Sequence, residues 1–458
     1  MLARLLPVGV MTLLSLAPVH ALADPATPKD QPVEQPEVFV DEPMLGVPRS
    51  GPSPEGWRTL LQPSRREWTL SRPHGWAWDR GLGVIGSFAV GAYTEGSSAD
   101  ARPRHLSADD PQRSGFLISR LELGGKWAAS GPRSSHLEAL VFAGLANGAQ
   151  WVVDEARLGA LMSWGADLQL DVGVLRAQLG WQNDQHEVQQ WLSRRPALAS
   201  AILGRNPLVA PGARVTTMVG LPAQGFVSAS AELLTVDRVE DRTAGIQTFG
   251  GGGAESATGV FALRGGVGDT WRADVGASYA IGRAYFPDPT TLCSIENTSL
   301  ACPTARSHVA GGYVALGWRP TEFHEGAHQL IRLVVESLAR RVPTYGLTEG
   351  ALYVELDATL LPRSQYHRGR WIEAALRLDL VGTPGDDTLL RKSQLVSGAL
   401  TWYPTEWVRL RLYGQYDHKP QALKAPTPPA PPEQDSVAVF LQTEFYLGDL
   451  GWHFWGNH

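Results

Sequence analysis

The sequence predicts an all-β fold, a transmembrane antiparallel β-barrel of about 16 strands with short periplasmic turns and long outer loops. Three observations lead to this prediction. From residue 82 onward, apolar and polar residues alternate over short segments bounded by Gly, Pro, Asp or Asn. These segments are even in number, and the connections between them are alternately long and short. Beyond residue 23, no apolar run is long enough to form a membrane-spanning helix.

The amino terminus has the pattern of a secretory signal peptide. Arg4 precedes an apolar run from Leu5 to Leu16, and Ala21-Leu22-Ala23 supplies the small residues of a cleavage site. The apolar run is shorter than the roughly 20 residues of a spanning helix, which weighs against an uncleaved anchor. We therefore expect export and removal of residues 1–23.

Two further segments precede the barrel. Residues 24–56 are rich in Pro, Glu and Asp and poor in large apolar residues, so they cannot bury enough surface to offset the entropy of ordering. We expect a disordered periplasmic leader there and a short lead-in, rich in tryptophan, at 57–81. The barrel is predicted at 82–447, with a C-terminal extension at 448–458.

The alternation is clearest in the segment 408–413. Val408 and the two leucines that follow occupy one face, whereas Arg409, Arg411 and Tyr413 occupy the other. A soluble antiparallel sheet gives the same pattern, so alternation alone does not indicate a membrane protein. We expect strands at 82–94, 115–127, 135–146, 158–170, 172–182, 212–220, 225–236, 257–265, 270–282, 306–318, 327–338, 350–358, 370–381, 391–402, 405–417 and 435–447.

The lengths of the connections distinguish a membrane barrel from a soluble antiparallel sheet. With a periplasmic amino terminus, the inner turns are mostly brief, as is typical of outer-membrane barrels. The predicted outer loops are longer: 95–114, 146–157, 183–211, 237–256, 283–305, 339–349, 382–390 and 418–434. The 16 tryptophans fit the aromatic girdles of such a barrel, and the net charge of -6 argues against a nucleic-acid partner.

The two cysteines, Cys293 and Cys302, lie close together in one predicted outer loop. An oxidising compartment permits a disulfide between them. A metal site is the alternative, but it would require His or Cys partners nearby, and these are missing. We expect a disulfide, no metal and no cofactor.

The last quarter of the chain carries a family resemblance, in Trp371-Ile372-Glu373-Ala374-Ala375-Leu376-Arg377, Leu400-Thr401-Trp402-Tyr403-Pro404 and Val408-Arg409-Leu410. It resembles the phosphate-selective porin family, more weakly through 115–127 and 314–336. The resemblance implies a sixteen-stranded trimeric channel whose third outer loop folds inward. That loop is 183–211 here, and residues 193–204 are predicted to form a short helix within it. The family's phosphate-binding ladder of Arg and Lys has no residue-by-residue match.

Candidate site residues follow from the strand phase. Charges of both signs face the predicted lumen, where they could contact solute or pair with one another and only stiffen the wall. Arg194 and Arg195 lie in the predicted constriction loop, and we expect them to line its narrowest point. The assigned lumen residues are Arg120, Arg272, Arg332, Arg377, Arg409 and Arg411, with Glu122, Asp274, Glu336, Glu355, Asp357, Glu373, Asp379 and Glu444.

Two motifs suggest enzymes. His324-Glu325-Gly326-Ala327-His328 has zinc-protease spacing, but a glycine interrupts it and the segment is predicted to be an inner turn leading into a strand. Gly81-Leu82-Gly83-Val84-Ile85-Gly86 has dinucleotide-fingerprint spacing, but it opens a strand rather than a helix. Neither motif has the structural context its chemistry needs, so we do not expect an enzyme.

The expected function is passive diffusion of small hydrophilic solutes or ions, anions among them, through a porin in the outer membrane of a Gram-negative-type bacterium. Its partners would be outer-membrane lipid, the passing solute and, from the resemblance, two further copies of the chain. Two alternatives stay open: a barrel that is not a channel, serving as a scaffold or a rim-site enzyme, and a secreted soluble β-sheet binding protein.

Overall fold

The computed structural model consists of strands connected around a common interior. It describes residues 77–93, 114–130, 136–146, 150–163, 166–183, 192, 195–204, 208–222, 225–236, 249, 257–268, 270–285, 304–318, 331–361, 371–382, 392–405, 408–419 and 435–448. The strands are β1 (Ala77–Tyr93), β2 (Gly115–Ser130), β3 (His136–Ala146), β4 (Gln150–Ser163), β5 (Asp167–Arg176), β6 (Val209–Leu221), β7 (Gly225–Thr235), β8 (Ala257–Val267), β9 (Trp271–Tyr285), β10 (Thr304–Trp318), β11 (Ile331–Val342), β12 (Leu347–Leu361), β13 (Trp371–Val381), β14 (Ser393–Thr405), β15 (Val408–His418) and β16 (Ser436–Gly448).

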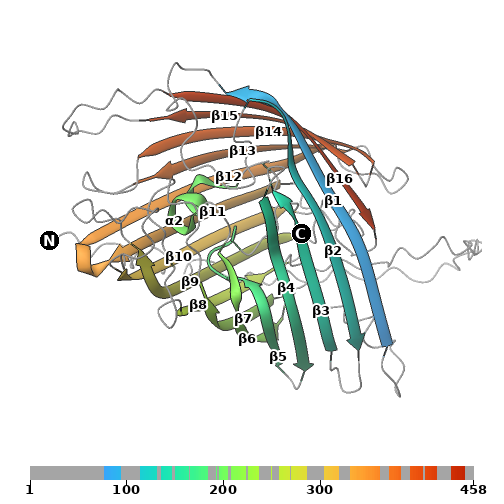
Figure 1. The fold of residues 1–458 in the computed structure, drawn as a ribbon, viewed down its shortest axis with the longest axis vertical. Coiled ribbons are helices and arrows are strands. Elements are labelled where there is room, and N and C mark those ends of the chain that lie inside the picture. The colour runs from blue at the N-terminus through green and yellow to red at the C-terminus, as the bar shows by residue number, and fades with distance from the viewer. Residues whose placement is uncertain are drawn as a thin grey trace, which may run out of the picture. The chain divides into compact units, whose positions relative to one another are not determined.

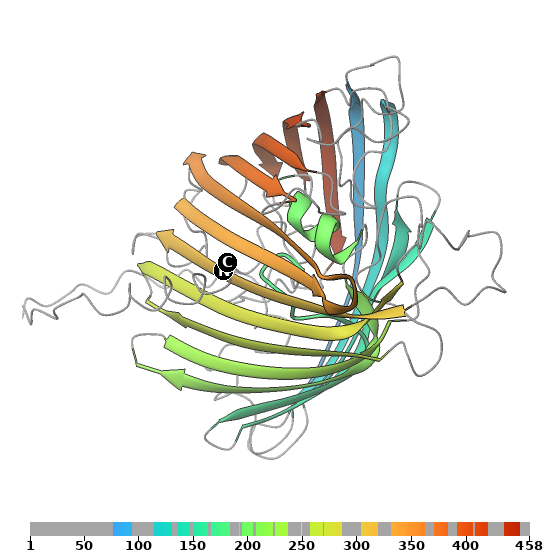
Figure 2. The ribbon, with the colours of Figure 1, turned by 90° about the vertical axis from the view of Figure 1, so that its left-hand side faces the viewer.

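The strands form one closed antiparallel barrel (Figures 1 and 2). Each strand pairs with its neighbours in sequence, and β1 pairs with β16, for example Phe88 with Thr443, to close the sheet. We call the end where β1 begins and β16 ends the turn end, and the opposite end the loop end. The predicted antiparallel barrel of about 16 strands is confirmed.

The barrel is polar inside and apolar outside. Along β15, Arg409, Arg411 and Tyr413 are each 1% exposed, whereas Leu412 on the opposite face is 52% exposed. Large apolar side chains are exposed on the outer face of nearly every strand, as Leu263 and Leu400 illustrate. This distribution is the inverse of a soluble core and matches a lipid-facing surface around a polar lumen.

Within the described ranges, no helix combines the length and apolar character needed to cross a bilayer.

Two strand predictions are wrong in position. The segments expected at 158–170 and 172–182 are β4 at Gln150–Ser163 and β5 at Asp167–Arg176, so most of the expected loop 146–157 is strand. The cause is a β-bulge, because Phe142 pairs with Glu155 and Ala143 with Val153, leaving Asp154 as the extra residue. Asp154 and Glu155 are adjacent and both buried, so they interrupt the alternation of polar and apolar residues. For this reason the sequence of the strand was interpreted as a loop.

Other strand boundaries differ as well. β1 begins at Ala77 rather than 82, because Ala77 to Gly81 pair with the end of β2. The predicted lead-in 57–81 therefore ends inside the barrel. The predicted outer loop 339–349 is mostly strand: β11 runs to Val342, a 3-10 turn covers Pro343–Tyr345, and β12 starts at Leu347. Gly346, at φ 63°, allows this tight connection. Gly81 to Gly86 lie within β1, in a strand as expected.

Several predictions fall outside the described residues. These are the signal peptide 1–23, the leader 24–56, the lead-in up to residue 76, the C-terminal extension beyond Gly448, the cysteines Cys293 and Cys302, Arg194, and the motif from His324 to His328.

Candidate functional site

The chain leaves the barrel wall after β5 and enters the lumen. Residues 177–183 and 195–204 lie inside the barrel, and the second stretch contains helix α2 (Ala197–Leu203), drawn within the ring of strands in Figures 1 and 2. The helix follows Pro196 and ends at Gly204, whose φ is 101°. An infolded segment and a short helix were both predicted here. The inward turn, however, begins at Ala177 rather than at 183, because apolar alternation continues past the wall through Leu175, Ala177 and Leu179.

Apolar packing holds α2 against one side of the lumen. All seven helix residues are buried, and the helix contacts β11, β12 and β13. Leu198 and Ile202, each 0% exposed, belong to the same apolar cluster as Val334 and Leu338 of β11 and Ala351 of β12. Full burial of a Leu or Ile side chain contributes roughly 1.5–3 kcal/mol, so this contact strongly favours the inward position.

Backbone hydrogen bonds fix the first half of the infolded segment. Glu336 on β11 accepts the backbone N–H of Trp181 at 2.8 Å through Oε1 and that of Gln182 at 3.3 Å through Oε2. Ser278 on β9 accepts the N–H of Gly180 at 2.9 Å. Gly180 has φ 76°, and a Cβ there would clash with Oε1 of Glu336, so this turn favours glycine.

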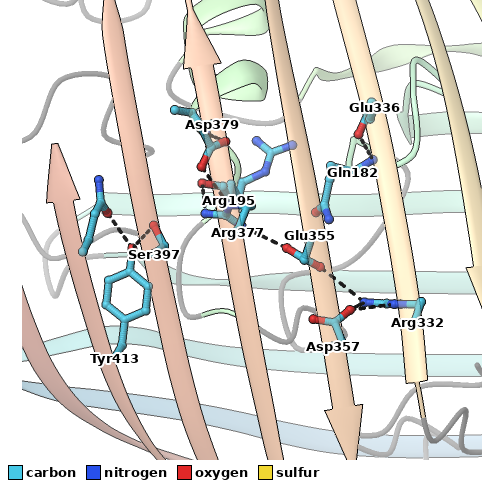
Figure 3. A network of polar contacts seen from close by, with 12 residues as sticks. Gln182, Arg195, Arg332, Glu336, Glu355, Asp357, Arg377, Asp379, Ser397 and Tyr413 are labelled. Carbon is cyan, nitrogen blue, oxygen red and sulfur yellow. Dashed lines mark hydrogen bonds and ion pairs between the residues drawn. The ribbon is translucent and has the colours of Figure 1, made fainter. Parts of the chain in front are cut away.

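The start of α2 is anchored on β13. Oδ1 of Asp379 accepts the N–H of Ala197 at 2.9 Å, and Nη2 of Arg377 donates to the carbonyl of Arg195 at 3.1 Å (Figure 3). Pro196 at the N-cap makes no side-chain capping bond, so the barrel wall supplies the acceptor that a helix start normally finds in its own sequence.

Asn183 joins the two ends of the infolded segment. Its Nδ2 donates to the carbonyl of Ala177 at 2.7 Å, and its Oδ1 accepts the N–H of Leu208 at 2.8 Å. Arg195 donates through Nη2 to the same Oδ1 at 3.3 Å and is 3% exposed. Arg195 therefore lies within the attachment of the segment, and its expected contact with solute stays a prediction.

We call β11, β12 and β13 the loop wall. On it Arg332 pairs with Asp357 at 2.8 Å and with Glu355 at 3.4 Å, while Arg377 pairs with Asp379 at 2.9 Å and Glu355 at 3.3 Å (Figure 3). These predicted lumen residues form one chain of charges beneath α2. All five are at most 4% exposed on their side chains.

We call β15, β16 and β2 to β6 the ladder wall, because here the charges bridge from strand to strand. Arg409 and Arg411 both pair with Glu444, the latter at 3.3 Å. Arg411 also donates to Thr401 and Gln442, each at 3.2 Å. Near them, the hydroxyl of Tyr403 on β14 donates to Glu373 on β13 at 2.7 Å.

The ladder continues across β2 to β6. Arg120 pairs with Glu122 and with the bulged Asp154. Further along, Arg157 contacts three carboxylates, Glu155 at 2.6 Å, Asp171 at 3.0 Å and Glu138 at 3.1 Å.

Asp171 extends the ladder to β6, where Arg214 donates to it at 3.0 Å. Outside both walls, Arg272 on β9 pairs with Asp274 at 2.8 Å and lies 5.6 Å from the ring centre of Phe226.

Three functional positions were missed from the sequence or missed in their role. Glu336 was assigned to the lumen, but its hydrogen bond from the backbone N–H of Trp181 was not predicted. The two residues are 155 positions apart, so no local sequence pattern indicates this bond. Asn183 and Gly180 were not singled out. A Gly-Trp step followed by Asn after an alternating run is a turn signal that could have marked the inward bend.

No family model matches the sequence, and no curated protein matches it. Solved structures do. The outer-membrane expressed OmpT of Vibrio cholerae has a TM-score of 0.51 at 10% identity, covering 82% of this chain and 99% of that one. An in-vitro folded trimer form of OmpT has 0.50 at 10%, covering 82% and 100%. An anion-selective porin from Comamonas acidovorans has 0.50 at 7%, covering 81% and 100%.

At these identities the likeness concerns the fold. The closed barrel of this chain is the architecture of solved outer-membrane proteins over nearly their whole length.

Proposed function

We propose that the protein is an outer-membrane porin that lets small hydrophilic solutes or ions diffuse through a charged lumen narrowed by residues 177–183 and 195–204. One observation carries the proposal: a barrel that is charged inside and apolar outside also holds part of its own chain across the lumen. Soluble proteins rarely expose an apolar surface of this extent to water. The segment narrows the passage, as a constriction requires.

The lumen charges support weak ion selectivity rather than a strong preference. Arginines on both walls pair with carboxylates, so a passing ion meets fixed charges of both signs. Arg409 and Arg411 share Glu444, so two arginines face one carboxylate there, and this is where we place contact with anions. Phosphate in particular has no dedicated set of arginines on the described strands. The proposal involves no catalytic step.

Assembly as a homotrimer belongs to the same proposal. One of the similar structures is a trimer form of a Vibrio cholerae outer membrane protein, and the resemblance in the last quarter of the chain implies the same assembly. The mass of the detergent-solubilised protein tests it directly.

A sealed barrel is the second candidate, and the burial of the lumen charges favours it. Arg409 and Arg411 are each 1% exposed, and Arg340 is 0% exposed, whereas side chains lining a wide water-filled channel keep more contact with solvent. Such a barrel would act as a scaffold.

Current through a planar bilayer separates the two candidates. Purified protein added to one side of a potassium chloride bilayer is expected to give discrete current steps, with a small reversal potential under a salt gradient because both charge signs line the lumen. Protein that inserts, as shown by heat-modifiable migration of the recovered material, yet carries no current would overturn the channel and support the scaffold.

A further inference from the structure

One aromatic ring inside the barrel is accessible to a passing solute. Of the aromatic side chains that the structure describes on the lumen side, Trp181 alone is partly exposed. The others are buried, as Tyr313 at 7% and Tyr413 at 1% exposure illustrate. Trp181 belongs to the infolded segment that narrows the passage, so a solute that crosses the constriction meets this indole.

Contacts with the barrel wall fix the orientation of the indole. Glu336 accepts the backbone N–H of Trp181 at 2.8 Å, and the same carboxylate accepts that of Gln182 (Figure 3). The indole packs against the ring of Tyr313 on β10, with centroids 5.0 Å apart and an interplanar angle of 57°. The Tyr313 ring in turn covers Gly276 on β9, where a Cβ would clash with it. A ring held in this way loses little further freedom when a ligand packs on it.

Polar groups beside the indole keep hydrogen-bonding capacity. Ser278 on β9 accepts the N–H of Gly180, the residue before Trp181, at 2.9 Å, and its hydroxyl hydrogen can donate to a further acceptor. The indole Nε1–H is enclosed and has no acceptor, which costs about 1–3 kcal/mol for a buried donor. A small group such as a hydroxyl at the edge of the ring supplies that acceptor after a slight tilt of the indole. The site therefore suits a ligand with several hydroxyls.

The charges next to the indole are of opposite sign. The two charged side chains that the structure shows bonded to residues 180–182 are Glu336 and Arg264, which donates to the carbonyl of Gly180 at 3.3 Å. Both are committed to the backbone, so neither favours an ion at this point. An apolar ring beside a few hydrogen-bonding groups selects a neutral ligand with one apolar face. The ring of a hexose fits this description, because its C–H groups form an apolar face and its hydroxyls point outward.

We infer that Trp181 is the centre of a weak sugar-binding site in the constriction, where a hexose packs on the indole and its hydroxyls bond to Ser278 and the indole N–H. The inference names a solute class for the proposed channel and rests on that proposal. Binding has to be weak, because a solute that passes through the channel must leave the site again. The channel should therefore distinguish a sugar from a neutral solute of the same size that lacks a ring.

Current noise induced by added sugar in a planar bilayer measures the binding. Glucose is compared with sorbitol, which carries similar hydroxyls on an open chain and has no ring face. The test variant is Trp181→Leu, and Trp181→Phe keeps a ring but removes the N–H. The matched control is Trp271→Leu, which removes an indole that is 71% exposed on the outer face at the turn end.

Wild-type protein and the control should bind glucose equally and more tightly than sorbitol. Trp181→Leu should bind glucose about tenfold more weakly, and Trp181→Phe about threefold. Unchanged affinity in Trp181→Leu, or equal noise from glucose and sorbitol in the wild type, would overturn the inference. So would stronger noise from tetramethylammonium than from glucose, which would indicate a cation site.

The conductance without sugar shows whether the substitution displaces the infolded segment. If Trp181→Leu changes that conductance, Trp181→Phe decides, and unchanged glucose affinity in Trp181→Phe then overturns the inference. Current steps that glucose does not affect refute the sugar site and leave the channel standing. Absence of current steps in the wild type refutes the channel itself, and the sugar site with it.

Discussion

The loop wall and the ladder wall use the same residue types on the same face of the strands for different purposes. On the loop wall, Glu336, Asp379 and Arg377 bind the backbone of the infolded segment. On the ladder wall, Arg157 and Arg409 bind carboxylates of neighbouring strands. The first arrangement joins strands and also holds a lumen segment in place, whereas the second only joins strands. Mutations on the loop wall should therefore change the conductance, and mutations on the ladder wall should change the free energy of unfolding.

The largest stability effect is expected on the ladder wall. Arg157→Ala leaves Glu138, Glu155 and Asp171 without their shared partner, and breaking a buried ion pair from one side costs about 3–5 kcal/mol. Urea unfolding of the protein in lipid vesicles measures the change. Lys126→Ala is the control, because Lys126 is 3.9 Å from Glu138 and partly exposed, and it should cost less than about 1 kcal/mol. Equal losses in the two variants would contradict the role assigned to Arg157.

A smaller effect is expected on the loop wall, and it should appear in the current. Gly180→Ala introduces a Cβ that clashes with Oε1 of Glu336 at a residue with positive φ, a strain of about 1–3 kcal/mol confined to the turn. The infolded segment should then leave its position more often and make single-channel currents noisier. Gly220→Ala, with open space around its Cβ, should leave the current unchanged. Quiet currents in Gly180→Ala would show that the turn does not depend on this contact.

The smallest effect is expected outside both walls, at Asp435. Burial acts to raise the pKa of Asp435, but hydrogen bonds from Tyr416, the Lys419 N–H and His418 outweigh it and lower that pKa to about 2. Because the folded pKa is below the ordinary value near 4, the stabilisation is present above pH 4 and is lost as the pH falls toward 2. The measurement is the melting temperature of the protein as a function of pH. In the wild type it should fall between pH 4 and pH 2, and Asp435→Asn should remove this dependence. The shift should be slight, since Asp435 is exposed.

The alternation of residues was enough to predict the barrel and the lumen face of its strands. Arg377 and Asp379 share a phase with Glu373 along β13, and that phase assigned all three to the lumen. Alternation fails at Asp154, where a bulge places two successive carboxylates inside. It also fails at Leu175 to Leu179, where buried residues alternate inside the lumen as they do on the wall.

Partners across the lumen could not be predicted. Strand phase indicates the face of a residue but not what lies opposite, and the bond from Trp181 to Glu336 joins segments five strands apart. For the same reason Arg332, which pairs on the wall, and Arg377, which also holds the infolded segment, had the same sequence signature.

The step conductance of two matched double variants tests the central claim most directly. Glu336→Gln with Asp379→Asn weakens the attachment of the infolded segment to the loop wall. Each of these carboxylates accepts hydrogen bonds through both oxygens, whereas an amide has one oxygen and must place its NH₂ against a second donor. Glu138→Gln with Asp171→Asn makes the same chemical and charge change on the ladder wall. We predict larger current steps for the loop-wall pair and wild-type steps for the ladder-wall pair. Steps of wild-type size from the loop-wall pair, or equal changes in both, would contradict the account.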